Sequence, residues 1–369
     1  MLQEFSTANL PRILRGSVSW LILLFTVSIM SSEQQQSTSV RIGFGAVAAN
    51  TLGMLHAADN NDSTETKIAV LIIDGQNNHG TWPKTTQMMK QYLEQSGRFE
   101  VDIARTRFTW QGKDYLEQYP LDDGIEYQSL DQPRHDPDFK PDFSQYQLVV
   151  NNFGFGAAPL PEATQQSLSE FVRNGGGLVS VHAADNCWPD WEDYNVMIGV
   201  GGWGGRSEKS GPAIYLDQDG NVQMDTTPGP GGSHGAQHDF VVTVRQPDHP
   251  IMAGLPRGFL HGRDELYDRL RGPARDVTVL ASAFSSKQFG GTDRHEPVLM
   301  TIPFGQGRVF HTILGHADYS MESVAFITTF LRGCEWAATG EVTLPVPDDF
   351  PDSSQIKKRD FTVVNESKN

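Results

Sequence analysis

The chain has 369 residues, of which 45 are acidic and 29 basic, so its formal net charge is −16 at pH 7. This acidic balance excludes a protein that holds nucleic-acid phosphates by bulk charge, because such proteins need a basic face. Hydrophobic residues make up 38% and charged residues 20% of the chain, which is typical of a globular protein and not of a disordered one.

Residues 1–66 are predicted to be a leader and linker in front of the folded domain. Arg12 and Arg15 precede an apolar run, Val18–Met30, which is about 13 residues long, whereas a membrane-spanning helix needs about 20. This pattern favours export to the periplasm or the medium by a signal segment, and it leaves a short membrane anchor open. A disordered leader with no role in export is the alternative.

The domain is predicted to begin with the continuous apolar run Lys67–Gly75, which ends in turn residues. Such a run is typical of a central parallel strand that is buried on both faces. A helix is predicted to follow from Thr81, because Pro83 suits the first turn of a helix and Gly97 suits its end.

Strands and helices continue to alternate at short spacings along the chain. Further strands are predicted at Phe99–Ala104, Tyr146–Asn152, Leu178–His182, Asp239–Val244, Val277–Ala281, Pro297–Ile302 and Arg308–Leu314, with helices after Pro161 and over Met321–Ala337. This order predicts an α/β fold, a doubly wound and mostly parallel sheet between helices, with residues 105–140 as a long polar loop. The domain is predicted to span 67–340, with 341–369 as a loosely packed tail.

Polar side chains follow several of the predicted strands at their carboxyl ends. Ligands bind at this edge in open α/β sheets, so these residues are the candidate site. Those predicted to be catalytic are His79, His182, His316 and Asp185. Those predicted to bind substrate are Asp74, Asn78, Asn152, Trp188, Trp191, Trp203, Asp264 and Glu265. His311 lies five residues before His316, about 16 Å away in an extended strand, and is predicted to be structural.

Several short motifs of the chain are recognisable. They are Lys67–Gly75 with His79, Gly175–Asn186 (GGGLVSVHAADN), Asp248–Ile251 (DHPI), Asp264–Tyr267 (DELY), Pro297 with Val298, and Gly305–Ala317 (GQGRVFHTILGHA). Together they resemble the ThuA-like, or trehalose-utilisation, family, and the resemblance covers residues 67–340. That family belongs to the class I glutamine amidotransferase-like superfamily, so the resemblance implies a flavodoxin-like fold.

The chain departs from that superfamily at the residues that would hydrolyse glutamine. An amidotransferase carries a nucleophilic Cys on the sharp turn after the strand that corresponds to 178–181, and here the position is His182. His316 resembles the superfamily's catalytic His, but Ala317 and Asp318 follow where a Pro-Glu pair would complete the triad. We therefore predict no glutaminase activity.

The two cysteines, Cys187 and Cys334, exclude a disulfide-stapled scaffold and a cysteine-based zinc cluster. Cys187 lies five residues beyond the turn at His182, which leaves a displaced nucleophile open beside a buried thiol or a partner in a disulfide with Cys334.

His79, His182 and His316 come from three different loops at one predicted edge. Such a set suits either acid–base catalysis by imidazole or a divalent metal ion, and the sequence leaves the choice open. No nucleotide cofactor is implied, because the glycine-rich stretches match no phosphate loop or dinucleotide fingerprint. His234, His238 and Asp239 lie in a glycine-rich segment that could cover this edge.

Trp188, Trp191 and Trp203 add aromatic faces near the same edge, which suit stacking against sugar rings. The leading hypothesis is therefore an exported ThuA-like enzyme of sugar or modified-disaccharide catabolism, with hydrolysis, isomerisation and elimination all open. A non-catalytic carbohydrate-binding or scaffold protein is the alternative. The expected partner is a small carbohydrate; no nucleic acid and no membrane span in the domain are expected, and the oligomeric state is left open.

Overall fold

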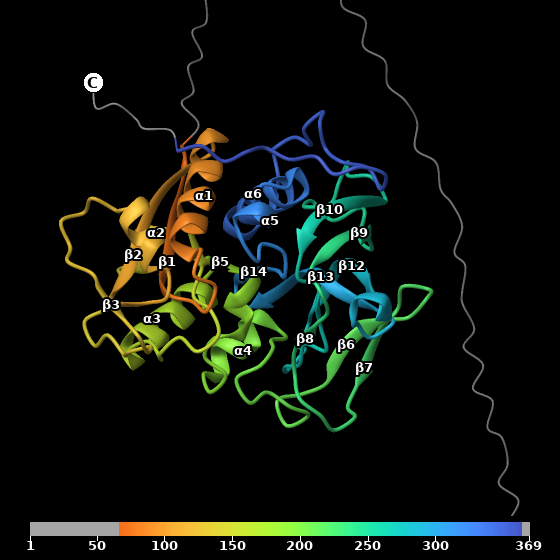
Figure 1. The fold of residues 1–369 in the computed structure, drawn as a ribbon, viewed down its shortest axis with the longest axis horizontal. Helices are drawn as coiled ribbons and strands as arrows, with labels where there is room; N and C mark the ends of the chain where they lie inside the picture. Colours follow the sequence, from red (N-terminus) through yellow and green to blue (C-terminus); the bar gives the residue numbers. More distant parts are fainter. Residues whose placement is uncertain (1–65, 364–369) are drawn as a thin grey trace, which may run out of the picture. The chain divides into compact units, whose positions relative to one another are not determined.

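A computed structural model describes residues 66–363 of the chain, so the predicted leader lies outside the described residues except for Thr66. Within this part of the chain, twelve strands form one sheet, ordered β10-β9-β12-β13-β14-β5-β4-β1-β2-β3, with β6 and β7 joined to β13. Figure 1 shows α1 and α6 on one side of this sheet and α3 and α4 on the other. None of the helices in residues 66–363 is both long and apolar enough to span a membrane.

One half of the sheet is parallel and carries the helices. Its strands are β1 (Ile68–Gln76), β2 (Phe99–Trp110), β3 (Gln128–Leu130), β4 (Leu148–Asn151), β5 (Gly177–Val181) and β14 (Gly307–Thr312). Its helices are α1 (Trp82–Gln95), α2 (Lys113–Gln118), α3 (Glu162–Arg173), α4 (Glu192–Ile198), α5 (Asp318–Met321) and α6 (Val324–Thr339). The predicted α/β fold with a doubly wound, mostly parallel sheet is confirmed.

The other half of the sheet is antiparallel and was only partly predicted. It consists of β6 (Ala213–Leu216), β7 (Val222–Asp225), β9 (His238–Val244), β10 (Gly258–Asp264), β12 (Thr278–Ser285) and β13 (Arg294–Phe304), while β8 (Ser233–His234) and β11 (Tyr267–Asp268) form a separate pair. The predicted hairpin around Gly305 is present, since β13 pairs antiparallel with β14. The sheet therefore changes from parallel to antiparallel at β14.

The central strand β1 is buried on both faces, as its apolar run predicted. Val70, Ile72 and Ile73 are fully buried, because helices cover both sides of the sheet. Helix α1 starts at Trp82 with Pro83 in its first turn, and it packs Met88, Met89 and Leu93 into the core. Burial of this apolar surface is the main favourable contribution to folding here.

Two segments differ from the sequence prediction. Residues 105–140 are not wholly a loop, because β2 continues to Trp110 beside β1 and α2 and β3 follow. The segment after α6 is anchored and not loosely packed. Val324 N donates to Lys357 O, Arg359 N donates to Glu322 O, and Leu260 N donates to Asp352 O. Figure 1 shows this segment crossing the molecule from β10 to α1.

Strand β13 carries a carboxyl group into the core. Glu296 is 2% exposed, and its carboxylate accepts hydrogen bonds from Thr292 Oγ1 at 2.7 Å and from Arg269 N at 3.4 Å. Burial, aided by the nearby charge of Asp268, raises the pKa of Glu296 to about 7. The folded protein therefore holds a proton there that the unfolded chain has already released between about pH 4.5 and 7.

We expect Glu296→Gln to stabilise the protein at pH 8 and to have little effect near pH 4.5. An acid whose folded-state pKa is raised contributes stability below its unfolded pKa of 4.5, and that contribution is lost as the pH rises through 7. Thermal unfolding should show a melting temperature raised by at least about 2 °C at pH 8.

Glu335→Gln is the matched control, because hydrogen bonds from Thr343, Leu344 and Arg98 outweigh burial and hold the pKa of Glu335 below its usual range. This variant should instead lower the melting temperature at neutral pH. An equal response of both variants at pH 8 would contradict the assignment of Glu296.

Candidate active site

His182 occupies the sharp turn directly after β5, where its backbone takes φ +46°, a conformation that is uncommon for a residue with a side chain. Its ring is 2% exposed, and Nδ1 lies 2.6 Å from the carbonyl oxygen of Ile313. A carbonyl can only accept, so Nδ1 carries the proton and donates. In the neutral ring the lone pair of His182 is then on Nε2, which faces the candidate site.

Tyr267, in the short strand β11, closes one side of the site. Its hydroxyl lies 2.7 Å from His182 Nε2 and 3.3 Å from Asn186 Nδ2. Since Nε2 of the neutral ring accepts, Tyr267 donates to it and accepts from Asn186. The ring of Trp203 packs against Tyr267 with 4.9 Å between centroids. Tyr267 was not among the predicted site residues.

Glu265 is the carboxylate at the centre of the site, although it is only 8% exposed. Its Oε2 lies 3.0 Å from His316 Nδ1 and 3.6 Å from His182 Nε2, and its Oε1 lies 3.7 Å from His234 Nε2. Burial by itself would raise the pKa of Glu265. The imidazoles of His182 and His316 outweigh burial and hold that pKa well below its usual range.

His79 reaches the site from the loop after β1, where its backbone N–H donates to Asn77 Oδ1 at 2.9 Å. Its ring centroid lies 4.3 Å from that of His316 and 5.0 Å from that of His182. Burial, aided by these two neighbouring rings, lowers the pKa of His79 to about 2. His79 is therefore a neutral imidazole across the whole physiological range.

Asp264 positions the loop that carries His316 and does not face the pocket. It is fully buried, and its carboxylate accepts from Gly315 N at 2.8 Å and from His316 N at 3.1 Å. His261 Nε2 lies 2.8 Å from the same carboxylate. The predicted contact of Asp264 with substrate is therefore replaced by a role in fixing the backbone at His316.

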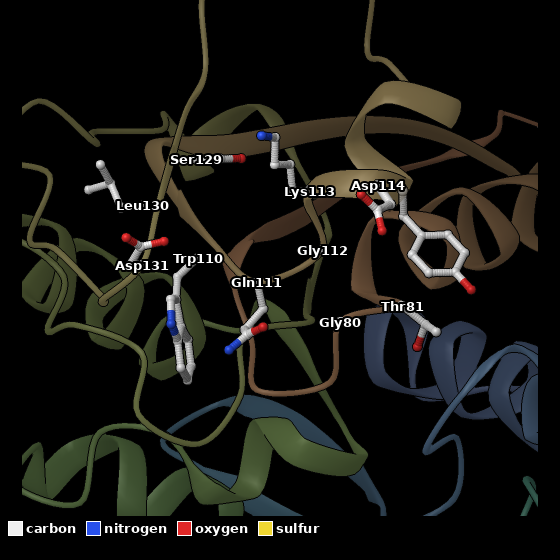
Figure 2. A pocket seen from close by; sticks show the side chains of 11 residues that line it. Gly80, Thr81, Trp110, Gln111, Gly112, Lys113, Asp114, Ser129, Leu130 and Asp131 are labelled. Carbon is white, nitrogen blue, oxygen red and sulfur yellow. The ribbon is translucent and has the colours of Figure 1, made fainter.

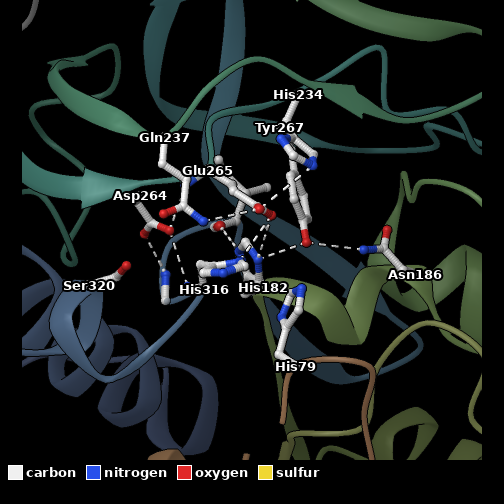
Figure 3. Close-up of polar contacts among 12 residues, drawn as sticks. His79, His182, Asn186, His234, Gln237, Asp264, Glu265, Tyr267, His316 and Ser320 are labelled. Carbon is white, nitrogen blue, oxygen red and sulfur yellow. Dashed lines mark hydrogen bonds and ion pairs between the residues drawn. The ribbon is translucent and has the colours of Figure 1, made fainter. Parts of the chain in front are cut away.

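His79, Glu265, Tyr267 and His316 border a pocket of about 280 Å³, and His182, which is not part of its lining, contacts Tyr267 and Glu265. Its lining residues are Asn78, His79, Phe155, Asn186, Trp203, His234, Glu265, Tyr267 and His316. Figure 3 shows the rings of His79, His182 and His316 gathered beneath Glu265, with Tyr267 beside them. The structure thus brings together the three predicted histidines with Asn78, Trp203 and Glu265 from the predicted set.

A second hollow, of about 550 Å³, lies nearby and begins at Gly80, the residue after His79. Figure 2 shows its wall, which includes Trp110, Lys113 and Asp131. None of the clustered histidines and neither oxygen of Glu265 borders it. The candidate chemistry therefore belongs to the smaller pocket.

Five predicted site residues lie elsewhere, each engaged by neighbours within the fold. Asp74 forms a buried bidentate ion pair with Arg105 and accepts from Thr86 Oγ1 at 2.8 Å. Asn152 donates to Thr85 and Thr86 and so holds the start of α1. Asp185 lies 3.1 Å from His311 Nε2, and both are fully buried.

Trp188 and Trp191 also lie away from the pocket. Trp188 packs against Phe153 and donates through Nε1 to Ala158 O at 3.0 Å, while Trp191 stacks on Tyr194 with 5.3 Å between centroids. His311 is fully buried, and its Nδ1 lies 2.9 Å from the carbonyl oxygen of Ile198, in keeping with its predicted structural role. The aromatic residues that line the pocket are instead Phe155, Trp203 and Tyr267.

The thiol of Cys187 is buried and lies 3.0 Å from Ala184 O, to which it donates. Burial raises the pKa of this thiol to about 12, so the thiolate that a nucleophile needs is disfavoured. Cys187 and Cys334 are both free, and the disulfide that the sequence left open is not formed.

Comparison with known proteins agrees with this geometry. The model of the family ThuA, described as trehalose utilisation, matches residues 69–337. The chain belongs to the ThuA family. A ThuA-like protein of Parabacteroides merdae shares 40% identity with it at a TM-score of 0.70, over 80% of this chain and 98% of that one. No curated protein matched.

A second ThuA-like protein, from Bacteroides uniformis, is 17% identical at a TM-score of 0.44, over 75% of this chain and 93% of that one. The family model and the 40% identical relative confirm the resemblance inferred from the sequence motifs, and with it the flavodoxin-like arrangement of the parallel half of the sheet.

We expect Asp74→Asn to destabilise the ThuA domain, because it leaves the buried guanidinium of Arg105 without its carboxylate. Breaking a buried ion pair costs about 3–5 kcal/mol, so the free energy of unfolding in denaturant should fall by about that amount. The control is Asp349→Asn, which removes the exposed pair with Arg359 and should cost less than about 1 kcal/mol. Equal stability of the two variants would contradict a structural role for Asp74.

Proposed function

We propose that this ThuA-family chain is an enzyme that acts on a sugar or modified disaccharide in the pocket beside His79, His182, His316 and Glu265. The observation that carries the proposal is the convergence of three imidazoles and one carboxylate from four separate loops onto one pocket. Buried polar groups need partners to be stable, so such a costly cluster at an open pocket points to chemistry more than to folding.

The shape and the wall of the pocket favour a sugar. A volume of about 280 Å³ is at the lower end for small-molecule sites, which suits one ring of a disaccharide. Trp203 and Phe155 supply flat apolar faces for the C–H surface of that ring. Asn78 and Asn186 supply amide groups for its hydroxyls, and the side-chain oxygen of Asn78 has no hydrogen-bond partner in residues 66–363.

The cluster also contains groups that can move protons. Glu265 lies within 3.0 Å of His316, which is the arrangement of a base oriented and supported by a carboxylate. The hydroxyl of Tyr267 lies on the other side, beside His182. Hydrolysis, isomerisation and elimination each need one proton removed, from water, a hydroxyl or a carbon, and one proton delivered, to an oxygen or a carbon.

Sugar binding without chemistry is the second candidate function, and the aromatic wall favours it equally. The two functions differ in what Glu265 contributes. For a binding protein, the carboxylate affects affinity alone, whereas for an enzyme it affects turnover at saturating sugar.

Export by residues 1–66 is a further part of the proposal. N-terminal sequencing of the protein recovered outside the cytoplasm would test it.

We expect Glu265→Gln to lower kcat by about 10²- to 10⁴-fold on any sugar or modified disaccharide that the enzyme turns over, since general acid–base groups contribute about that much. Because neighbouring imidazoles hold the pKa of Glu265 well below its usual range, the loss of the carboxylate should also lower the melting temperature at neutral pH, so kcat is compared at a temperature at which both proteins are folded. Product formation is followed by chromatography. If the wild-type protein binds sugar but forms no product from any sugar tested, only the binding function is left.

His135→Gln serves as the matched control. His135 is an exposed histidine whose Nδ1 contacts Pro159 O, and it belongs neither to the cluster nor to the lining of the pocket. Its kcat should equal that of the wild type.

We expect Trp203→Ala to raise KM more than it lowers kcat. Trp203 contacts the pocket through its ring face and holds no proton that the reaction could use, so its loss removes binding in ground and transition states alike. Steady-state kinetics would check this. A large fall in kcat with KM unchanged would contradict the assignment of Trp203 to sugar binding. Trp191→Ala, outside the pocket, is the comparison variant.

A further inference from the structure

We propose that the cluster is a metal site that holds one divalent first-row transition ion, with Zn²⁺ as its representative, through four side chains: His79, His182, His316 and Glu265. This inference deepens the proposed function of the same site and rests on it for the location of the pocket. It names what the imidazoles do there, which is to serve as ligands.

The spacing of the donor atoms fits one ion. One ligand atom from each of the four side chains lies within 4.8 Å of all the others. In a tetrahedral site with bonds of about 2.0–2.1 Å, neighbouring ligand atoms are about 3.3–3.4 Å apart. The contacts of Glu265 Oε2 with His316 Nδ1 and His182 Nε2, at 3.0 and 3.6 Å, lie on either side of that value. The four ligand atoms would have to move only slightly closer together to bind one ion.

The donor types also select the class of ion. Three imidazoles and one carboxylate suit zinc and its neighbours in the first transition row, whereas calcium and magnesium prefer oxygen ligands. The described residues place no cysteine in the cluster, since Cys187 is bonded to Ala184 O within the core.

The structure fixes the orientation of two ligands from outside the cluster. His182 donates from Nδ1 to the carbonyl oxygen of Ile313 at 2.6 Å, which leaves Nε2 as the donor atom toward the ion. Metal-binding histidines commonly hold their other ring nitrogen in this way. Asp264 accepts hydrogen bonds from the backbone N–H groups of Gly315 and His316 and so fixes the loop that carries His316, the second of these ligands.

In the described part of the chain, the ring nitrogens of His79 and Nδ1 of His316 have no hydrogen-bond partner that would compete with an ion. His316 Nδ1 is buried without a hydrogen bond of proper geometry, although Glu265 is only 3.0 Å away. Among residues 66–363, neither ring nitrogen of His79 has a hydrogen-bond partner, yet His79 lies against both other rings. Without an ion, the buried Nδ1 of His316 is an unsatisfied polar atom, which is costly, and a shared cation would satisfy it.

Tyr267 provides the competing explanation for His182. Its hydroxyl donates to His182 Nε2 at 2.7 Å, and it would have to release that nitrogen to an ion. Tyr267 and His234 would then border the ion outside the ligand set and remain available for proton transfer. Because the four side chains would fill a tetrahedral site, such an ion could polarise a sugar oxygen only by taking it as a fifth ligand.

The test is metal binding to the full chain, purified without a histidine tag and dialysed against a chelator. With Zn²⁺ alone as the probe, we expect calorimetry and elemental analysis to give one ion per chain and a raised melting temperature. The absorption of bound Co²⁺ should report nitrogen and oxygen ligands. Absence of Zn²⁺ binding by the folded wild-type chain would overturn the proposal.

Variants test the ligand set. Because even outer partners of metal ligands are worth about 10- to 100-fold in affinity, His79→Gln, His316→Gln and Glu265→Gln should each weaken Zn²⁺ binding by at least about 100-fold. Tyr267→Phe should keep or raise the affinity, since it removes the competitor for His182 Nε2. His135→Gln should bind as the wild type does. Unchanged binding in the ligand variants would place the ion on the surface and overturn the proposal.

The two proposals fail separately. Turnover of sugar by chelated protein that binds no Zn²⁺ would overturn the metal site and leave the enzyme. One tightly held ion, lost in the ligand variants, would support the metal site even if no sugar tested were turned over.

Discussion

The hydrogen bond from His182 Nδ1 to the carbonyl oxygen of Ile313 is the interaction on which the site depends. It joins the ends of β5 and β14, two adjacent parallel strands, and β14 is the strand at which the sheet changes from parallel to antiparallel. It also fixes which nitrogen of His182 faces the pocket, and it anchors the chain three residues before His316. The strained backbone of His182 at φ +46° is tolerated because this bond and the surrounding core hold the turn.

Buried charge in this domain falls into two kinds of environment. In the first, a carboxylate has one dedicated ion-pair partner, as Asp74 has Arg105 and Asp185 has His311, although Asp185 Oδ1 has no hydrogen-bond partner within residues 66–363. In the second, Glu265 lies among three imidazoles, and no single one of them is its dedicated partner. One-to-one pairs hold elements together, whereas a shared carboxylate beside an open pocket is free to exchange its partners. This difference, more than burial, distinguishes Glu265 of the proposed site from the carboxylates that join elements of the fold.

The parallel half of the sheet was predictable because its strands are continuous apolar runs, and their carboxyl ends located His79, His182 and His316. The antiparallel strands were harder, since half-exposed strands such as β10 carry no such run. Glu265 was assigned to substrate and Tyr267 was overlooked, because their loop reaches the pocket only through pairing of β11 with β8. Asp74 and Asp185 also follow strands, but their partners, Arg105 and His311, lie 31 and 126 residues away along the chain.

The turn after β5 shows how a fold can keep a geometry while changing its chemistry. A strained turn at the end of a parallel strand projects its side chain clear of the backbone, which serves a nucleophile that must meet a carbonyl. An imidazole at the same place extends further from the backbone. It offers a lone pair to a proton or an ion and does not form a covalent bond to a carbonyl. The single nearby thiol, Cys187, is buried with its pKa raised to about 12, so it does not supply a nucleophile in place of His182. A turn of the kind that suits covalent catalysis therefore also suits the role of ligand or proton carrier that we propose for His182.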